Sequence, residues 1–340
     1  MRNDTRQKFS QYVATLRQLN GVGPDVHQFA VAPAVQQKLE TRTQESSAFL
    51  QSINIIGVDQ QAGEKIGLGV GSPVSSTTDT EAKERQTTDP TGLDGVGYLC
   101  TQTNFDTHLK YAKLDAWSHF DDFQTRIRDL LVQRRALDRM LIGFNGKTRA
   151  ANSDRATNPL LQDVNIGWLE KYRQHAAARV LKEGTKSAGK ILIGAGGDYA
   201  NLDALVMDAV AGMIEPWYRR DTKLVAILGD DLLHDKYFPL VNKDQAPTEQ
   251  LATDLIISQK RVGGKQAVAA AGFPTTSILI TRLDNLSIYW QRGSMRRSII
   301  DNPKRDRIEN FESSNEAYVV EDFGAGCLID NIEFVAPAGA

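Results

Sequence analysis

Residues 98–112 read YLCTQTNFDTHLKYA, and this stretch carries the strongest signal for the fold. Apolar and threonine side chains occupy the odd positions from Leu99 to Tyr111, and mostly polar side chains occupy the even positions, which is the alternation of a β-strand. At ~3.3 Å per residue the run would extend roughly 50 Å, whereas typical strands have about 5 to 6 residues. We therefore expect one over-long strand that projects beyond its own domain and finds neighbours there.

A long amphipathic helix is expected directly after this strand. Large apolar side chains recur every three or four residues over residues 115–144, which places them on one face of a helix of roughly 45 Å. Before the strand, residues 72–97 contain almost no large apolar side chains and would not fold alone. We expect residues 59–112 to form an extended two-stranded arm with a polar tip. Long arms on a long helical spine indicate a building block for assembly.

Shorter elements are expected on both sides of this pair, which together make an α+β fold. Helices are expected at residues 5–20, 34–52, 159–181, 201–218, 230–237 and 248–258. Strands are expected at residues 53–58, 64–70, 190–193, 224–228, 266–270, 277–281, 286–291, 296–300, 317–321 and 325–332. The strands after residue 286 are expected to return and pair beside the spine helix.

The composition excludes several classes of protein. A chain of 340 residues is long enough to bury a real core, and its formal net charge of -2 argues against a broadly cationic nucleic-acid binder, because neutralising phosphates requires clustered Lys and Arg. Cys100 and Cys327 are too few for a disulfide framework, which favours a reducing cytoplasm. No apolar run approaches the ~20 residues that span a bilayer, and the N-terminus lacks the apolar middle of a secretory signal. We expect no membrane partner.

No catalytic, cofactor or metal site is expected. The glycine-rich stretch 194–197 (GAGG) lacks a phosphate-binding motif, and Asp198 behind it would repel a phosphate but suits a helix N-cap. Asp115, His119 and Asp122 share one helix face, yet two carboxylates and one imidazole without a fourth ligand favour a solvated face over a metal site.

One charged pair falls within the apolar stripe of the expected spine helix. Arg134 and Asp138 lie four residues apart and can pair with each other. If both are buried, removing one charge would destabilise the protein more than removing both. Alternatively, the pair lies at the edge of the stripe and Arg134 extends its guanidinium group into solvent.

The N-terminal segment has a charge opposite to that of the remaining chain. It has four basic residues and two acidic ones before residue 27, which leaves the remainder at -4. Its expected helix at residues 5–20 ends where Gly21, Gly23 and Pro24 follow. The segment is either a detachable leader or a helical arm docked on the main body.

Several long stretches resemble the major capsid protein of P-two-like temperate tailed phages. They include QESSAFLQSINI (44–55), TNFDTHLKYAKLDAW (103–117), NPLLQDVNIGWLEKYR (158–173), GDYANLDALVMDA (197–209) and DKYFPLVNK (235–243), together with residues 283–328. The resemblance runs almost from end to end, but the chain departs from the family at residues 90–97 and 182–196. It implies the Hong Kong 97-type capsid fold.

On that plan the chain divides into six parts. These are a scaffold-like leader (1–29), an N-terminal arm (30–58), an extended loop (59–112), a peripheral domain with the spine helix (113–158), an axial domain (159–285) and a return to the peripheral domain (286–340).

The resemblance also implies a function. Family members assemble in the host bacterial cytoplasm, as hexamers and pentamers, into an icosahedral head that encloses double-stranded DNA and becomes the virion capsid. Their partners are an internal scaffold and maturation protease protein and a portal protein. In the family the leader is cut after a phenylalanine, in a stretch that here reads HQFAVAP, which makes the bond between Phe29 and Ala30 the hypothesised processing site. An encapsulin-type compartment shares the fold and is the alternative, although it would hold an enzyme cargo and need no removable leader.

Overall fold

The computed structural model describes residues 1–65, 74–87, 95–120, 122–229, 231–234, 236 and 260–335. The N-terminal part contains α1 (Asn3–Leu19), β1 (Gln28–Ala30), α2 (Pro33–Glu45), α3 (Ala48–Ser52), β2 (Asn54–Val58) and β3 (Ala62–Gly63). After the extended loop follow β4 (Tyr98–Leu99), β5 (Thr101–Asn104), β6 (Thr107–Lys110), α4 (Tyr111–Trp117), α5 (Phe123–Asn145) and α6 (Trp168–His175).

The second half of the chain is rich in strands. Its first elements are β7 (Val180–Leu181), β8 (Ile191–Ile193), α7 (Leu202–Met213), β9 (Leu224–Leu228), β10 (Arg261–Val262), β11 (Lys265–Ala269) and β12 (Ile278–Arg282). Its last elements are β13 (Leu286–Gln291), β14 (Arg296–Asn302), β15 (Arg307–Val320), β16 (Cys327–Ile329) and β17 (Ile332–Phe334). Strands β9 and β13 have the bounds that the sequence predicts.

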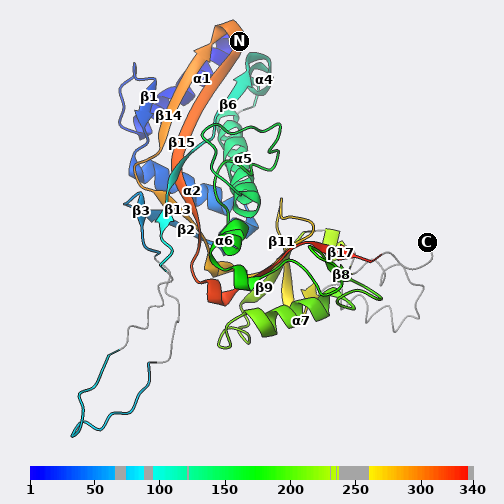
Figure 1. The fold of residues 1–340 in the computed structure, drawn as a ribbon. Helices are drawn as coiled ribbons and strands as arrows, with labels where there is room; N and C mark the ends of the chain where they lie inside the picture. Colours follow the sequence, from blue (N-terminus) through cyan, green and yellow to red (C-terminus); the bar gives the residue numbers. More distant parts are fainter. Residues whose placement is uncertain are drawn as a thin grey trace, which may run out of the picture.

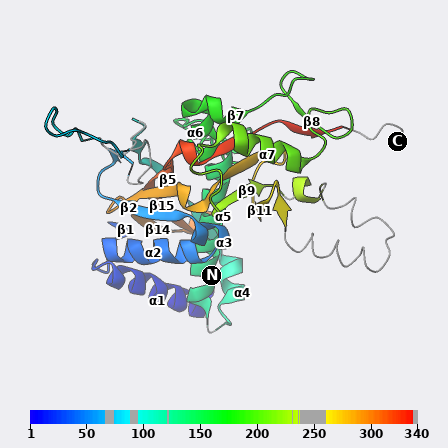
Figure 2. The same ribbon diagram turned by 90° about the horizontal axis from the view of Figure 1, so that it is seen from below.

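Two sheets organise the body (Figure 1). In the first, the strand order is β1-β14-β15-β13-β2, and β5 and β6 also pair with β15. In the second, the order is β10-β11-β9-β12-β16-β7, and β8 and β17 form a separate parallel pair. Helix α7 packs on the second sheet, and Figure 2 shows α1 and α2 on the same side of the first sheet. The main apolar core lies between the sheets, where α5 and α6 contribute Phe144, Trp168 and Tyr172.

The prediction of a single over-long strand at residues 98–112 is wrong. The stretch divides into β4, β5 and β6, and helix α4 begins at Tyr111. Its residues lie within the body, because Asn104 is opposite Ser313 and Thr107 is opposite Asn310 on β15, in one continuous register. The long strand is β15 itself, with 14 residues, of which only residues 317–320 fall within the strand expected at residues 317–321.

The spine helix is also shorter than expected. It divides into α4 and α5 around residues 118–122, of which residue 121 lies outside the described part. The hydroxyl group of Ser118 donates a hydrogen bond to the carbonyl oxygen of Asp115 at 2.8 Å, which is the kind of local bond that competes with helix continuation. Phe120, which the expected stripe would bury, is 45% exposed.

Two other expected helices are shorter because the chain turns tightly against its neighbours. Residues 34–52 form α2 and α3, since the side chain of Ser47 accepts a hydrogen bond from the backbone N–H of Leu50 and starts a new helix. Residues 159–181 contain α6, a short 3-10 helix (Ala177–Arg179) and β7, and the helix begins only after Gly167, where the chain lies so close to α5 that a Cβ would be 2.3 Å from the Ile142 carbonyl oxygen. The expected elements 64–70 and 248–258 lie wholly or mostly outside the described residues, and residues 231–234 are helical as expected.

The extended loop leaves the body between β3 and β4, which pair at its base. Residues 74–87 are all exposed, and Figure 1 shows them far from the remainder of the chain. No contact with another described residue therefore buries this segment.

Candidate functional site

A cluster of buried charges connects three elements of the body, and we call it the ion cluster. It consists of Arg135 and Arg139 on α5, Glu40 on α2, and Glu312 and Glu316 on β15. Their exposed fractions do not exceed 9%, and Arg139 and Glu316 are completely buried. Alternation along β15 and four-residue spacing along α5 bring these side chains to the same interior position.

The contacts within the ion cluster are short and reciprocal. Arg139 donates from Nη1 to Oε2 of Glu40 at 2.6 Å and from Nη2 to Oε1 of Glu316 at 2.7 Å. Arg135 donates to Glu40 at 3.0 Å, to Glu312 at 3.0 Å and to Glu316 at 2.9 Å. Each guanidinium group thus binds carboxylates from both α2 and β15, which fixes the N-terminal arm and the sheet to the spine helix.

Electrostatics favour the ionised forms of Glu316 and Arg139. Burial alone would raise the pKa of Glu316, but the guanidinium groups of Arg139 and Arg135 outweigh that effect and lower it. Burial would likewise lower the pKa of Arg139, but Glu316 and Glu40 raise it well above its ordinary value. The arrangement is structural, because a carboxylate held by two guanidinium groups is a poor proton carrier.

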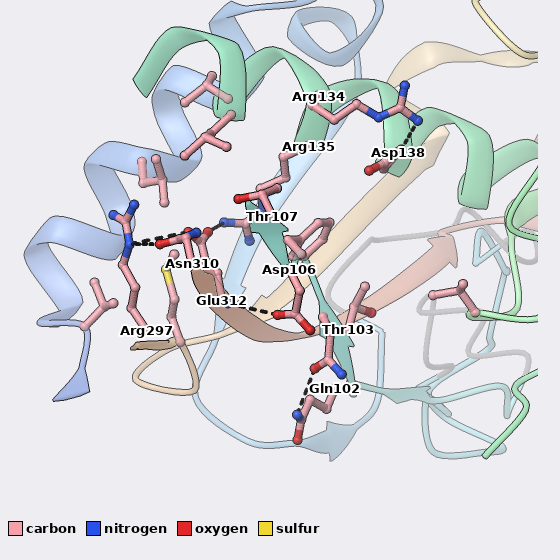
Figure 3. Close-up of a pocket in the computed structure, with 18 of the residues that line it drawn as sticks. Gln102, Thr103, Asp106, Thr107, Arg134, Arg135, Asp138, Arg297, Asn310 and Glu312 are labelled. Atoms are coloured by element: carbon pink, nitrogen blue, oxygen red, sulfur yellow. Dashed lines mark hydrogen bonds and ion pairs between the residues drawn. The ribbon is translucent and has the colours of Figure 1, made fainter. Parts of the chain in front are cut away.

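The structure places Arg134 and Asp138 at the edge of the interior. Nη2 of Arg134 donates a hydrogen bond to Oδ1 of Asp138, and the side chains are 55% and 22% exposed respectively (Figure 3). The edge position is therefore the one observed, and the buried alternative is wrong for Arg134. The buried charged residues of α5 are instead Arg135 and Arg139, each one residue after a member of the expected pair. The sequence analysis did not single them out, although they have the same four-residue spacing.

The leader helix α1 is docked on the body rather than detached. Phe9 and Tyr12 are buried in an apolar cluster that includes Phe123 and Ile127 of α5. The backbone N–H of Arg2 donates to Oδ1 of Asp115 at 2.9 Å. Asp115 therefore faces the leader, and the described residues contain no group of three or more His, Cys, Asp or Glu side chains that could hold a metal ion.

The hypothesised processing bond lies in the edge strand of the first sheet. Phe29 and Ala30 belong to β1, which pairs antiparallel with β14 so that Phe29 is opposite Arg297. The Phe29 side chain is buried with Val31 and Met295. In this conformation the bond is part of a sheet, and a protease would require β1 to separate from β14 first.

A groove lies between α1, α2 and α5, and we call it the basic groove. Its cavity volume is about 930 Å³, and its lining includes eight basic and four acidic residues. Figure 3 shows Arg297, Asn310 and Glu312 on one side of it, and Arg134 and Asp138 on α5. The sequence analysis missed this groove because its lining combines the N-terminal helices with α5, residues 102–107 and residues 149–164, which are far from those helices in the chain.

The glycine-rich stretch 194–197 is a turn. The backbone N–H of Gly197 donates to the carbonyl oxygen of Gly194 at 2.9 Å. Asp198 does not cap α7 as expected, because its carboxylate accepts from the N–H of Leu192 at 2.9 Å instead. The N-cap of α7 is Asn201, whose side chain accepts from Ala204.

In the described part of the chain, no helix is long and apolar enough to cross a membrane.

Comparison with solved structures identifies the class of protein to which this fold belongs. The chain aligns with the capsid of an empty GTA particle at a TM-score of 0.50 and 15% identity, over 85% of this chain and 90% of that one, which shows a shared capsid fold. The expected α+β capsid fold is confirmed.

The chain belongs to the P2 family of phage major capsid proteins, whose family model matches residues 8–332. It is 51% identical over 351 residues to the capsid proteins of Escherichia phage P2, covering 100% of this chain and 98% of that sequence. It is 41% identical to the major capsid protein of Serratia phage KSP20, covering 99% of each. The family role is structural rather than catalytic.

A solved procapsid shows the same similarity in three dimensions. The procapsid of satellite phage P4, which includes the size determination (Sid) protein, contains a chain that matches this one at a TM-score of 0.83 and 49% identity. The match covers 98% of this chain and 99% of that one. The predicted resemblance is therefore confirmed, and the chain belongs with phage capsid proteins rather than with the encapsulin-type alternative.

Proposed function

We propose that the chain assembles as hexamers and pentamers into an icosahedral phage head that encloses double-stranded DNA. The observation that carries the proposal is the extended loop, whose residues 74–87 are all exposed and lie far from the body (Figure 1). A polar loop that is paired only at its base, by β3 and β4, is marginally stable alone. It becomes ordered when it lies over a neighbouring subunit, where weak contacts suffice because many copies act together.

Deletion of residues 82–95 tests this use of the loop. We expect the shortened chain to remain folded and soluble but to form no closed shells, as seen by electron microscopy and sedimentation. A control variant replaces the same residues by a Gly-Ser linker of equal length, which keeps the reach of the loop and removes its side chains. Normal shells from the deletion variant would contradict the proposal.

Processing between Phe29 and Ala30 belongs to the proposed function. Cutting there removes a leader with four basic and two acidic residues, so the shell that remains is more acidic and repels DNA phosphates from its surface. We expect intact mass spectrometry of mature shells to show a chain that starts at Ala30. Mature shells whose chain still runs from Met1 to Ala340 would refute this step.

The proposed partners are other proteins of the same assembly pathway. They are an internal scaffold and maturation protease protein and a portal protein, and assembly takes place in the host bacterial cytoplasm. The similar chain in the satellite phage P4 procapsid occurs together with a size determination protein, which supports a shell that assembles with partner proteins. Co-purification of procapsids with the scaffold and portal from host lysates tests this set.

A further inference from the structure

We propose that the basic groove binds an acidic amphipathic helix of an assembly partner, and that removing the leader takes away one wall of this site. The proposal rests on the proposed leader processing only for its second half. The groove itself is defined by contacts between α1, α2 and α5 in the uncut chain.

The leader helix supplies the first wall. The groove-lining residues of α1 are Tyr12, Thr15, Leu16 and Leu19, whose spacing places them on one helix face. Leu19 is 58% exposed although it is a large apolar residue. This wall therefore offers apolar area that no other described part of the subunit covers.

Helix α2 supplies the second wall and two of the basic residues. Val35, Lys38, Leu39 and Arg42 line the groove with the same helical spacing, so two apolar side chains alternate with two basic ones. Lys38 and Arg42 are exposed, and neither has an acidic partner among the described residues. Such a face fits a helix that presents apolar side chains flanked by carboxylates.

The far side of the groove adds further positive charge. Arg155 is exposed and, in the part of the chain that the structure describes, has no acidic partner. Arg149 uses its guanidinium group to bind the carbonyl oxygens of Val164 at 2.9 Å and Gln102 at 2.6 Å, which leaves its charge uncompensated. A groove with this charge is unusual in a chain of net charge -2, and it favours an acidic occupant.

The dimensions of the groove fit a short piece of helix. A helix with side chains is about 10 Å across, so a volume of about 930 Å³ corresponds to roughly 12 Å of its length, or about two turns. Three surrounding helices that each present one face form the setting into which a fourth helix packs. Apolar residues on the α1 and α2 walls disfavour nucleic acid as the occupant, because a duplex would cover them with charged phosphates.

Leader removal would change this site directly. Cutting between Phe29 and Ala30 separates α1 from α2, so α1 can leave and the groove loses the wall that includes Leu16 and Leu19. Cleavage would therefore weaken binding of the partner at the stage when the shell no longer needs that partner. The groove thus links release of the partner to processing.

Peptide binding to the purified, uncut chain tests the site independently of shell formation. The probes are two fluorescent amphipathic helical peptides with the same leucine positions, one flanked by glutamates and the other by lysines. We expect the glutamate peptide to bind, measured by anisotropy, and the lysine peptide to bind at least about tenfold more weakly. The Lys38→Glu/Arg42→Glu substitutions are expected to weaken binding of the glutamate peptide by a similar factor. The control Lys304→Glu/Arg305→Glu makes the same charge change on an exposed turn away from the groove and is expected to have little effect.

A second variant tests the leader wall. Leu19→Glu alters an exposed side chain, so the fold should persist, and it is expected to weaken the glutamate peptide severalfold by removing apolar contact and adding repulsion. Equal binding of the two peptides, equal losses from the groove and control variants, or displacement of the peptide by a short DNA duplex would overturn the proposal. These outcomes are independent of whether the chain forms shells, so they do not depend on the proposed function.

Discussion

Replacing Arg139 by methionine is expected to destabilise the subunit strongly. Arg139 is fully buried and holds Glu40 at 2.6 Å and Glu316 at 2.7 and 3.1 Å. Without it, Oε2 of each carboxylate loses its guanidinium donor, and only Arg135 remains within reach of both residues. Removing one partner of a buried ion pair typically costs about 3–5 kcal/mol, because the remaining charge is left uncompensated. A domain is commonly stable by only about 5–15 kcal/mol, so this loss is a large fraction of the total.

The double variant Arg139→Met/Glu316→Met is expected to be more stable than Arg139→Met alone. It removes one charge of each sign and leaves Arg135 with Glu40 and Glu312. Replacing a buried pair by apolar side chains of similar size is often close to neutral, whereas breaking it is not. We therefore expect a coupling free energy of roughly 2–3 kcal/mol between the two positions.

Urea unfolding of the unassembled subunit measures these differences. Fluorescence of Trp168 and Trp290, both buried, follows the loss of the core, and the change in midpoint at constant slope gives the change in free energy. The matched control is Arg134→Met on the same helix, whose partner Asp138 is 22% exposed and which should lose less than about 1 kcal/mol. Equal losses for Arg134→Met and Arg139→Met would refute the reasoning.

Three further outcomes are expected. Because the pKa of Glu316 is lowered from 4.5 to about 2, its contribution to stability is fully present above pH 4.5 and is lost as the pH falls towards 2, which urea midpoints over that range should show. Gly143→Ala should destabilise the subunit by about 1–3 kcal/mol, because the added Cβ would lie 2.2 Å from Cζ3 of the buried Trp168. Burial raises the pKa of the Cys100 and Cys327 thiols to about 12, so both should react with a thiol reagent far more slowly in the native subunit than in urea.

Each of these outcomes has its own control. An acid-induced loss of stability that is equally large in the Arg139→Met variant would argue against Glu316 as its source. Gly212→Ala on α7 meets no atom within 4 Å and should be neutral or slightly stabilising, since alanine favours helix over glycine by up to about 1 kcal/mol. Rapid labelling of either cysteine in the native subunit would show that its environment opens more easily than the structure indicates.

Elements with apolar interior positions were predictable from the sequence. Strand β9 is buried at all five positions and strand β13 at five of six, and both were expected with their observed bounds. The part of β15 before Ala317 was missed because its interior positions include Glu312, Ser314 and Glu316. Those side chains face inward only because Arg135 and Arg139 compensate them, and that information lies on another element.

The buried charges of the candidate site could not be predicted from the sequence either, because their burial depends on contacts between elements. Arg134 with Asp138 and Arg135 with Arg139 have the same four-residue spacing, so spacing alone does not indicate which pair is buried. The rotation of α5 about its own axis relative to β15 determines which pair is buried. That rotation depends on tertiary contacts such as the packing of Trp168 on Gly143. The basic groove could not be predicted from the sequence because it too depends on tertiary contacts.

Electron microscopy of the full chain, expressed with its scaffold and protease partner, tests the central claim most directly. A subunit that belongs to this capsid family and carries an exposed loop at residues 74–87 is expected to form closed icosahedral shells made of hexamers and pentamers. Purified material that stays monomeric under these conditions, or that forms only irregular aggregates, would contradict the account.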